Sequence, residues 1–121
     1  MKVYSVHFVL KGKSDYKDLA PVFPELLSAF LEADEQTPSE DEIMQMFIDL
    51  NVSDLERNRK PEGYNRKGKL RLVFPMDRKE FYIKAYNKNT DMTGITEKIS
   101  GMLMAAGVKF EILRDDRADF E

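Results

Sequence analysis

The sequence predicts an α+β domain, because two kinds of apolar periodicity alternate along the chain. Segments in which apolar and polar residues alternate, as they do in half-buried strands, are 3–10, 70–86 and 108–112. Segments in which apolar residues recur every three or four positions, as they do on a helix, are 22–31, 39–50 and 92–106. At 121 residues the chain suits one core, so we expect a single domain over 1–121 with an insertion at 34–69.

The first strand is predicted at residues 3–10. Tyr4, Val6, Phe8 and Leu10 share one face, which we expect to meet the core. His7 falls on the opposite face, and no Asp or Glu lies beside it in the sequence to orient its ring as a general base needs. We therefore expect His7 to be a surface residue.

Two helices should follow this strand. The first begins near residues 22–24, where Pro24 is tolerated because the first turn does not use its missing N–H. The second covers 39–50, with Ser39 as its cap. Its apolar residues spread over a wider arc than a surface helix needs. We expect Ile43 and Phe47 to face the core and Met44 and Ile48 to contact a partner.

The second half of the chain predicts a long loop, a hairpin, a helix and a last strand. Residues 57–69 are polar, and 70–86 read as two strands joined by a turn at 77–79. Pro75 cannot donate a ladder hydrogen bond, so its strand should lie at a sheet edge. Gly107 is placed to cap the third helix before the strand that includes 108–112.

The predicted order is strand, helix, inserted helix, strand, strand, helix, strand. With right-handed crossovers this order resembles the ferredoxin-like split βαβ fold. That resemblance implies a four-stranded antiparallel sheet, ordered fourth, first, third, second, with two helices on one face.

The charged residues are segregated along the insertion. From Asp34 to Glu56 every charged residue is acidic, whereas from Arg57 to Arg71 the one acid is Glu62. Such blocks indicate a solvated acidic surface followed by a basic loop, which would suit a charged partner.

Composition excludes several kinds of chemistry. The chain has no cysteine, which removes disulfides, thiolate nucleophiles and cysteine-based metal sites. No apolar run is long enough to span a bilayer, and no secretory h-region follows the first residues. We expect a cytoplasmic protein with no membrane partner, no metal, no cofactor and no catalytic residues.

The sheet face opposite the core suggests nucleic-acid binding as an alternative function. Aromatic rings interleaved with cations bind single strands by stacking on bases and pairing with phosphates. The segment Lys79–Tyr86 resembles the third strand of RNA-recognition motifs, although it lacks their glycine. The residues of this alternative site, on the face and in the basic loop, are His7, Arg59, Lys60, Arg66, Lys67, Arg71, Tyr82, Lys84 and Tyr86.

We expect the main function to be that of a small non-enzymatic interaction protein. It would bind another protein, or a second copy of itself, through the inserted helix 39–50, the basic loop 57–71 or the open sheet face. The predicted interface residues are Met44, Ile48 and Val73. Single-stranded nucleic-acid binding is the first alternative, and a small enzyme is the second.

Overall fold

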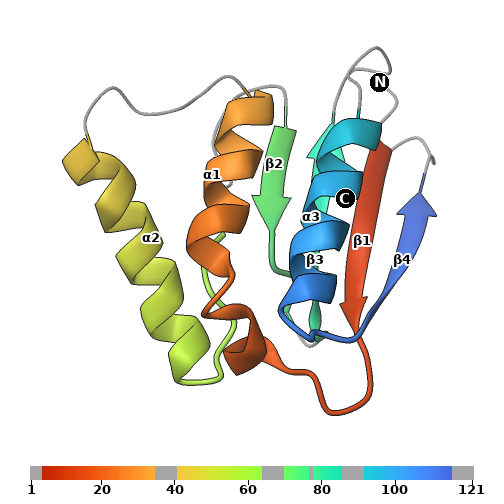
Figure 1. Ribbon diagram of the computed structural model, residues 1–121, viewed down its shortest axis with the longest axis horizontal. Helices are drawn as coiled ribbons and strands as arrows, with labels where there is room; N and C mark the ends of the chain where they lie inside the picture. Colours follow the sequence, from red (N-terminus) through yellow and green to blue (C-terminus); the bar gives the residue numbers. More distant parts are fainter. Residues whose placement is uncertain (1–3, 35–40, 64–69, 77, 86–91, 116–121) are drawn as a thin grey trace.

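The strands form one antiparallel sheet in the order β2-β3-β1-β4 (Figure 1). A computed structural model describes residues 4–34, 41–63, 70–76, 78–85 and 92–115. The strands are β1 (Tyr4–Leu10), β2 (Leu70–Val73), β3 (Glu80–Ala85) and β4 (Phe110–Asp115). The predicted α+β class with a four-stranded antiparallel sheet is confirmed.

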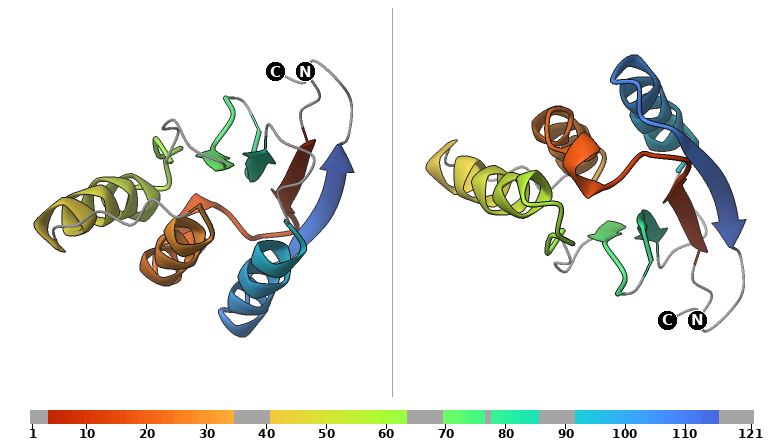
Figure 2. Two further views of the ribbon diagram at one scale, coloured as in Figure 1. Left: turned by 90° about the horizontal axis from the view of Figure 1, so that it is seen from above. Right: turned by 90° about the horizontal axis from the view of Figure 1, so that it is seen from below.

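In the described residues, three α-helices accompany the sheet, namely α1 (Phe23–Asp34), α2 (Asp41–Glu56) and α3 (Thr93–Ala105). Viewed from above and below, α1 and α3 lie on the same face of the sheet, and α2 lies outside α1, beyond the β2 edge (Figure 2). A short 3₁₀ helix, η1 (Tyr16–Leu19), precedes α1 and contacts α2. No helix was predicted from the sequence at η1.

The core lies between α1, α3 and the sheet. Val6, Phe8 and Leu10 of β1 are buried in it, as their alternation predicts, and the ring of Phe8 stacks on that of Phe81 at 4.9 Å between centroids. Phe81 also contacts the ring of Phe74. Contacting aromatic rings of β1, β3 and the residue after β2 therefore form part of the core.

The hairpin strand and the inserted helix end at other residues than predicted. The hairpin strand ends at Val73, so Pro75 follows the edge strand β2 instead of lying in it. The inserted helix continues past residue 50 to Glu56, through a segment of weak helix formers. Burial of Leu55 in the core favours this extra turn. The predicted cap Ser39 lies outside the described residues.

Asn51 attaches the segment after α2 to the rest of the domain. The Gly63 N–H donates to Oδ1 of Asn51 at 2.7 Å, and Nδ2 of Asn51 donates to the Phe47 carbonyl at 2.8 Å. Gly63 has a φ of 77°, and a Cβ there would lie 2.6 Å from the carbonyl oxygen of Leu72. Only glycine fits this close approach to β2.

We expect Gly63→Ala to destabilise the protein by about 1–3 kcal/mol, because it adds left-handed backbone strain to a steric clash. Gly101→Ala is the matched control: Gly101 lies inside α3 with nothing within 4 Å of its Cβ position, so alanine should stabilise by about 0.5–1 kcal/mol. Urea denaturation measures both changes. Equal effects of the two substitutions would contradict this account of Gly63.

Candidate functional site

The sheet face turned away from α1 and α3 carries a buried polar cluster. The register places His7 beside Tyr82 on β3, and Val9 beside Glu80. Ser5, His7 and Glu80 are all buried, with Ser5 only 1% exposed. The prediction of a surface His7 is therefore wrong, although the predicted face is correct.

The three side chains form a linear hydrogen-bonded array. Nδ1 of His7 lies 2.5 Å from Oε2 of Glu80, and Nε2 of His7 lies 2.9 Å from Oγ of Ser5. A carboxylate can only accept, so Nδ1 is the donor, and Nε2 of a neutral ring accepts the Ser5 hydroxyl proton. The array thus satisfies both ring nitrogens in a buried place.

This connectivity is that of a nucleophile, a base and an orienting acid. A nucleophile must also be reached by substrate, and it needs free donors nearby for a developing oxyanion. Ser5 is buried, and β1 is paired with β3 on one side and β4 on the other, which engages its peptide groups. We therefore interpret the array as a structural link between β1 and β3.

Sequence reasoning missed the partner of His7 because Glu80 lies 73 residues away. The sequence nevertheless contained a pattern from which this contact could have been predicted. Glu80 has the same strand parity as Tyr82, so pairing the first strand with the hairpin strand would have placed it on the face of His7.

The described residues of this face do not form the aromatic platform that the nucleic-acid alternative needs. The Tyr82 side chain is 6% exposed, and its ring lies against that of His7 with centroids 4.6 Å apart. Lys84 is buried and Arg71 half-buried. A base cannot stack on a covered ring.

Of the remaining residues of that alternative, the structure describes Arg59 and Lys60. Arg59 and Lys60 are exposed on the segment after α2, where Arg59 pairs with Asp54 at 3.1 Å. Arg66, Lys67 and Tyr86 lie outside the described residues.

A second candidate surface is the outer side of α2. The α2 outer stripe consists of Ile43, Met46 and Leu50, which are 39%, 50% and 60% exposed. These residues are three and four positions apart, so they follow one side of the helix over two turns. Exposed Glu42 and Asp49 flank them.

The predicted assignment of this helix needs correction. Met44 and Ile48 are half-buried and pack against the core, whereas Ile43, which was expected to face the core, belongs to the exposed stripe. The docking of α2 on α1 and η1 turns the helix so that Met44, Phe47 and Ile48 face inward. Val73 is half-buried at the β2 edge.

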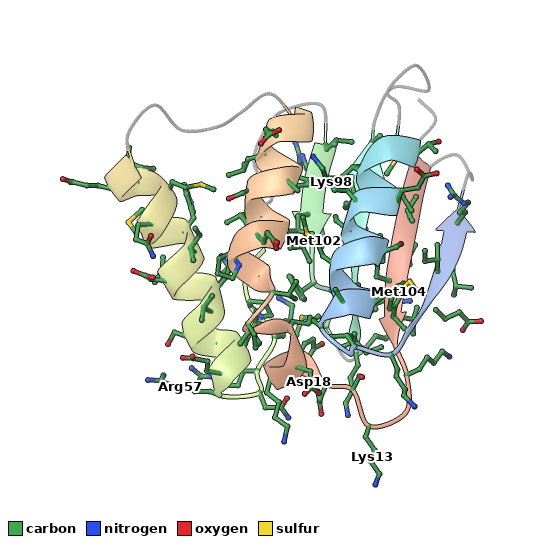
Figure 3. The ribbon with its side chains drawn as sticks, viewed as in Figure 1. Lys13, Asp18, Arg57, Lys98, Met102 and Met104 are labelled. Carbon is green, nitrogen blue, oxygen red and sulfur yellow. The ribbon has the colours of Figure 1, made fainter. Side chains whose placement is uncertain are left out.

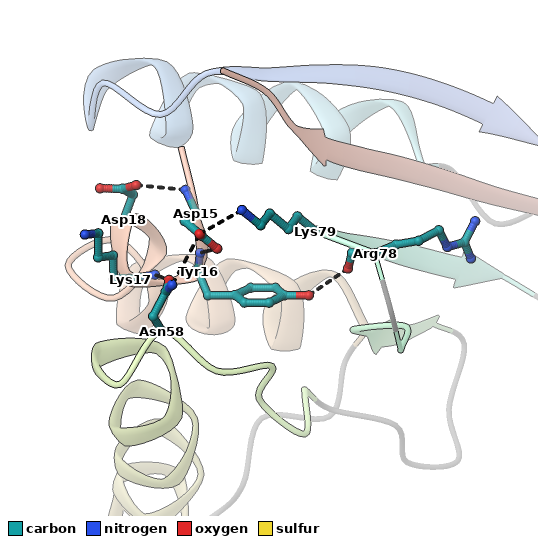
Figure 4. A network of polar contacts seen from close by, with 7 residues as sticks. All are labelled: Asp15, Tyr16, Lys17, Asp18, Asn58, Arg78 and Lys79. Atoms are coloured by element: carbon teal, nitrogen blue, oxygen red, sulfur yellow. Dashed lines mark hydrogen bonds and ion pairs between the residues drawn. The ribbon is translucent and has the colours of Figure 1, made fainter. Parts of the chain in front are cut away.

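A polar network holds the segment after α2 against the start of η1 (Figure 4). Oδ2 of Asp15 accepts from Asn58 at 3.2 Å and pairs with Nζ of Lys79 at 2.9 Å. The Lys17 N–H donates to Oδ1 of Asn58 at 3.0 Å, and the Tyr16 hydroxyl donates to the Arg78 carbonyl. Three distant segments of the chain are joined in this way.

Comparisons with known proteins add no assignment: no family model, curated protein or solved structure matches the chain. Within the described ranges, no helix is both long and apolar enough to cross a bilayer. The same residues contain no cluster of three or more His, Cys, Asp or Glu side chains suited to a metal ion.

We expect Glu80→Ala to destabilise the protein by about 1–3 kcal/mol, because it leaves the buried Nδ1 of His7 without its carboxylate. Glu111→Ala removes an exposed carboxylate whose partner is Lys11, so it should change stability by about 0.5 kcal/mol or less. A double-mutant cycle with His7→Ala measures the coupling. Additive effects of Glu80→Ala and His7→Ala would contradict the array.

The Asp15 network should make stability depend on pH. Burial raises the pKa of Asp15. Hydrogen bonds from Lys79, the Tyr16 N–H and Asn58 together lower this pKa by a larger amount, so it lies below the ordinary 3.8. The folded state then holds this proton less tightly than the unfolded state. The stabilisation is present above the ordinary pKa and is lost as pH falls through the folded value.

We therefore expect the wild type to exceed Asp15→Asn in free energy of unfolding at neutral pH. The difference should shrink as pH falls below about 3.8. Denaturation of both proteins at a series of pH values measures it. A difference that stays constant or grows in acid would show that Asp15 does not act through its charge.

Proposed function

We propose that this protein is a non-enzymatic interaction protein that docks the α2 outer stripe on a partner protein. The observation that carries the proposal is the stripe itself, three large apolar side chains exposed along one side of a helix. A contiguous exposed apolar surface with a polar border is typical of interaction sites. Methionine in its centre suits such a surface, because the side chain adapts its shape.

The charges beside the stripe favour a particular kind of partner. Helix α2 contains Asp41, Glu42, Asp49, Asp54 and Glu56 and no lysine or arginine. A second copy docked along the same helix would bring acid against acid. A partner whose apolar surface is bordered by lysine and arginine is complementary in both respects.

The fold proposed for this protein is the ferredoxin-like split βαβ arrangement, with α2 and the segment after it as the insertion. The strand order β2-β3-β1-β4 and the pairing of β3 between β1 and β2 support it. Cytoplasmic location and the absence of a cofactor stay predictions.

The alternative, single-stranded nucleic-acid binding, is supported less well. Its sheet-face residues Tyr82 and Lys84 are buried, so among the described residues it would depend on the exposed cations Arg59 and Lys60. An enzymatic function is also supported less well, because Ser5, which has the position of a nucleophile in the array, is buried.

A model ligand tests the proposal. An amphipathic helical peptide with leucine on one face and lysine on the other presents the required chemistry, and the same peptide with glutamate in place of lysine is its control. We expect the lysine peptide to bind the wild type and the glutamate peptide to bind about ten-fold more weakly or not at all.

The decisive variant is Met46→Asp, which should weaken binding of the lysine peptide about ten-fold or more, because it places a charge in the centre of the stripe. Met104→Asp is its matched control. Met104 is a 70% exposed methionine of α3, on the side turned away from Met102 and α1 (Figure 3). Isothermal titration calorimetry measures each affinity.

Charge attraction alone would predict the opposite result. Met46→Asp adds a negative charge, so a purely electrostatic contact with the lysine peptide would keep or gain affinity. That outcome, with both variants folded by circular dichroism, would contradict docking on the stripe.

A further inference from the structure

Strand β4 forms an edge of the sheet. In the part of the chain that the structure describes, its one paired neighbour is β1, and no described element lies beyond it (Figure 1). Glu111, Leu113 and Arg114 are exposed, with Leu113 at 51%, and Phe110 and Ile112 are half-buried. Edge strands of this kind can pair with another chain.

The hydrogen-bond pattern of the ladder shows which peptide groups of β4 face outward. The Lys11 N–H donates to the Lys109 carbonyl at 2.9 Å, and the two residues continue the β1–β4 register. In an antiparallel ladder bonded pairs alternate with non-bonded pairs. Lys109, Glu111 and Leu113 therefore direct their peptide groups toward β1.

The intervening residues Phe110, Ile112 and Arg114 direct their N–H and C=O groups away from β1, toward the open edge. The hydrogen bonds between β1 and β3 are consistent with this assignment of inward and outward peptide groups. The Leu10 N–H donates to the Lys79 carbonyl on the β3 side, so even residues of β1 bond β3 and odd residues bond β4.

We propose that β4 pairs antiparallel with β4 of a second copy, about a two-fold axis at Ile112. In this register Ile112 is bonded to Ile112 of the second copy, and Phe110 of each copy is bonded to Arg114 of the other. All the outward peptide groups of Phe110, Ile112 and Arg114 then have partners. The two sheets become one, with α3 of both copies on the same face.

Charged side chains favour this register over the two registers shifted by one residue in either direction of the axis. At the non-bonded positions it sets Lys109 of one copy opposite Asp115 of the other, and Glu111 opposite Leu113. A register centred on Leu113 sets Glu111 opposite Asp115, and one centred on Glu111 sets two glutamates opposite each other. Like charges directly opposite destabilise a strand pair.

The pairing should be a concentration-dependent equilibrium, because a six-residue edge is small compared with stable interfaces. It is independent of the docking proposed for α2, which lies beyond the opposite edge of the sheet. Met46→Asp should therefore leave it unchanged. Failure of either proposal does not affect the other.

Sedimentation equilibrium with charge-swapped variants tests the pairing. We expect the wild type to dimerise, and Lys109→Glu or Asp115→Lys alone to raise the dissociation constant about ten-fold, since each change acts twice across the axis. The double variant Lys109→Glu with Asp115→Lys should recover wild-type affinity. A monomeric wild type at about millimolar concentration, or a double variant as weak as the single ones, would overturn the proposal.

A backbone variant gives a second, independent test. Arg114→Pro removes an N–H that β1 does not use, so it should weaken the dimer about ten-fold or more through two lost hydrogen bonds. Arg114→Ala keeps the N–H and should stay within about three-fold of the wild type. Equal dimerisation of a folded Arg114→Pro variant and Arg114→Ala would overturn the pairing, and if Arg114→Pro does not fold, the charge swap decides.

Discussion

Strand β1 is paired on both sides, and this constraint determines most of the structure. Its even residues bond β3 through the backbone and place Val6 and Phe8 under the helices. Its odd residues bond β4 and place Ser5 and His7 on the other face. Because side chains alternate strictly along a strand, a shift of one residue would exchange the apolar core with the polar cluster.

The polar face needs its own internal partners, since α1 and α3 cover the opposite face. Glu80 of β3 is such a partner, because its carboxylate accepts a hydrogen bond from His7 of β1. This buried hydrogen bond is costly to break, because removing either side chain leaves a buried polar group without its partner. This face is thus part of the scaffold, and the surfaces that we propose for partners are the α2 outer stripe and the β4 edge.

Local patterns in the sequence predicted the strands, the three helices and the core side of β1, because each depends on residues a few positions apart. They did not predict the rotation of α2, since the packing of Met44 and Ile48 depends on α1 and η1. The His7 array was missed for the same reason: its acid lies on another strand. The predicted strand order already placed the last strand at an edge. Which of its peptide groups face outward depends on the hydrogen-bond pattern, which no side-chain pattern contains.

The most direct test of the scaffold role is the protonation of His7, the single histidine of the chain. A long-range ¹H–¹⁵N spectrum of the imidazole ring shows which nitrogen carries the proton. We predict the Nδ1–H tautomer with a slowly exchanging proton, held by Glu80 while Nε2 accepts from Ser5. An Nε2–H tautomer, or a ring whose protons exchange rapidly with water, would contradict a closed polar cluster on this face of the sheet.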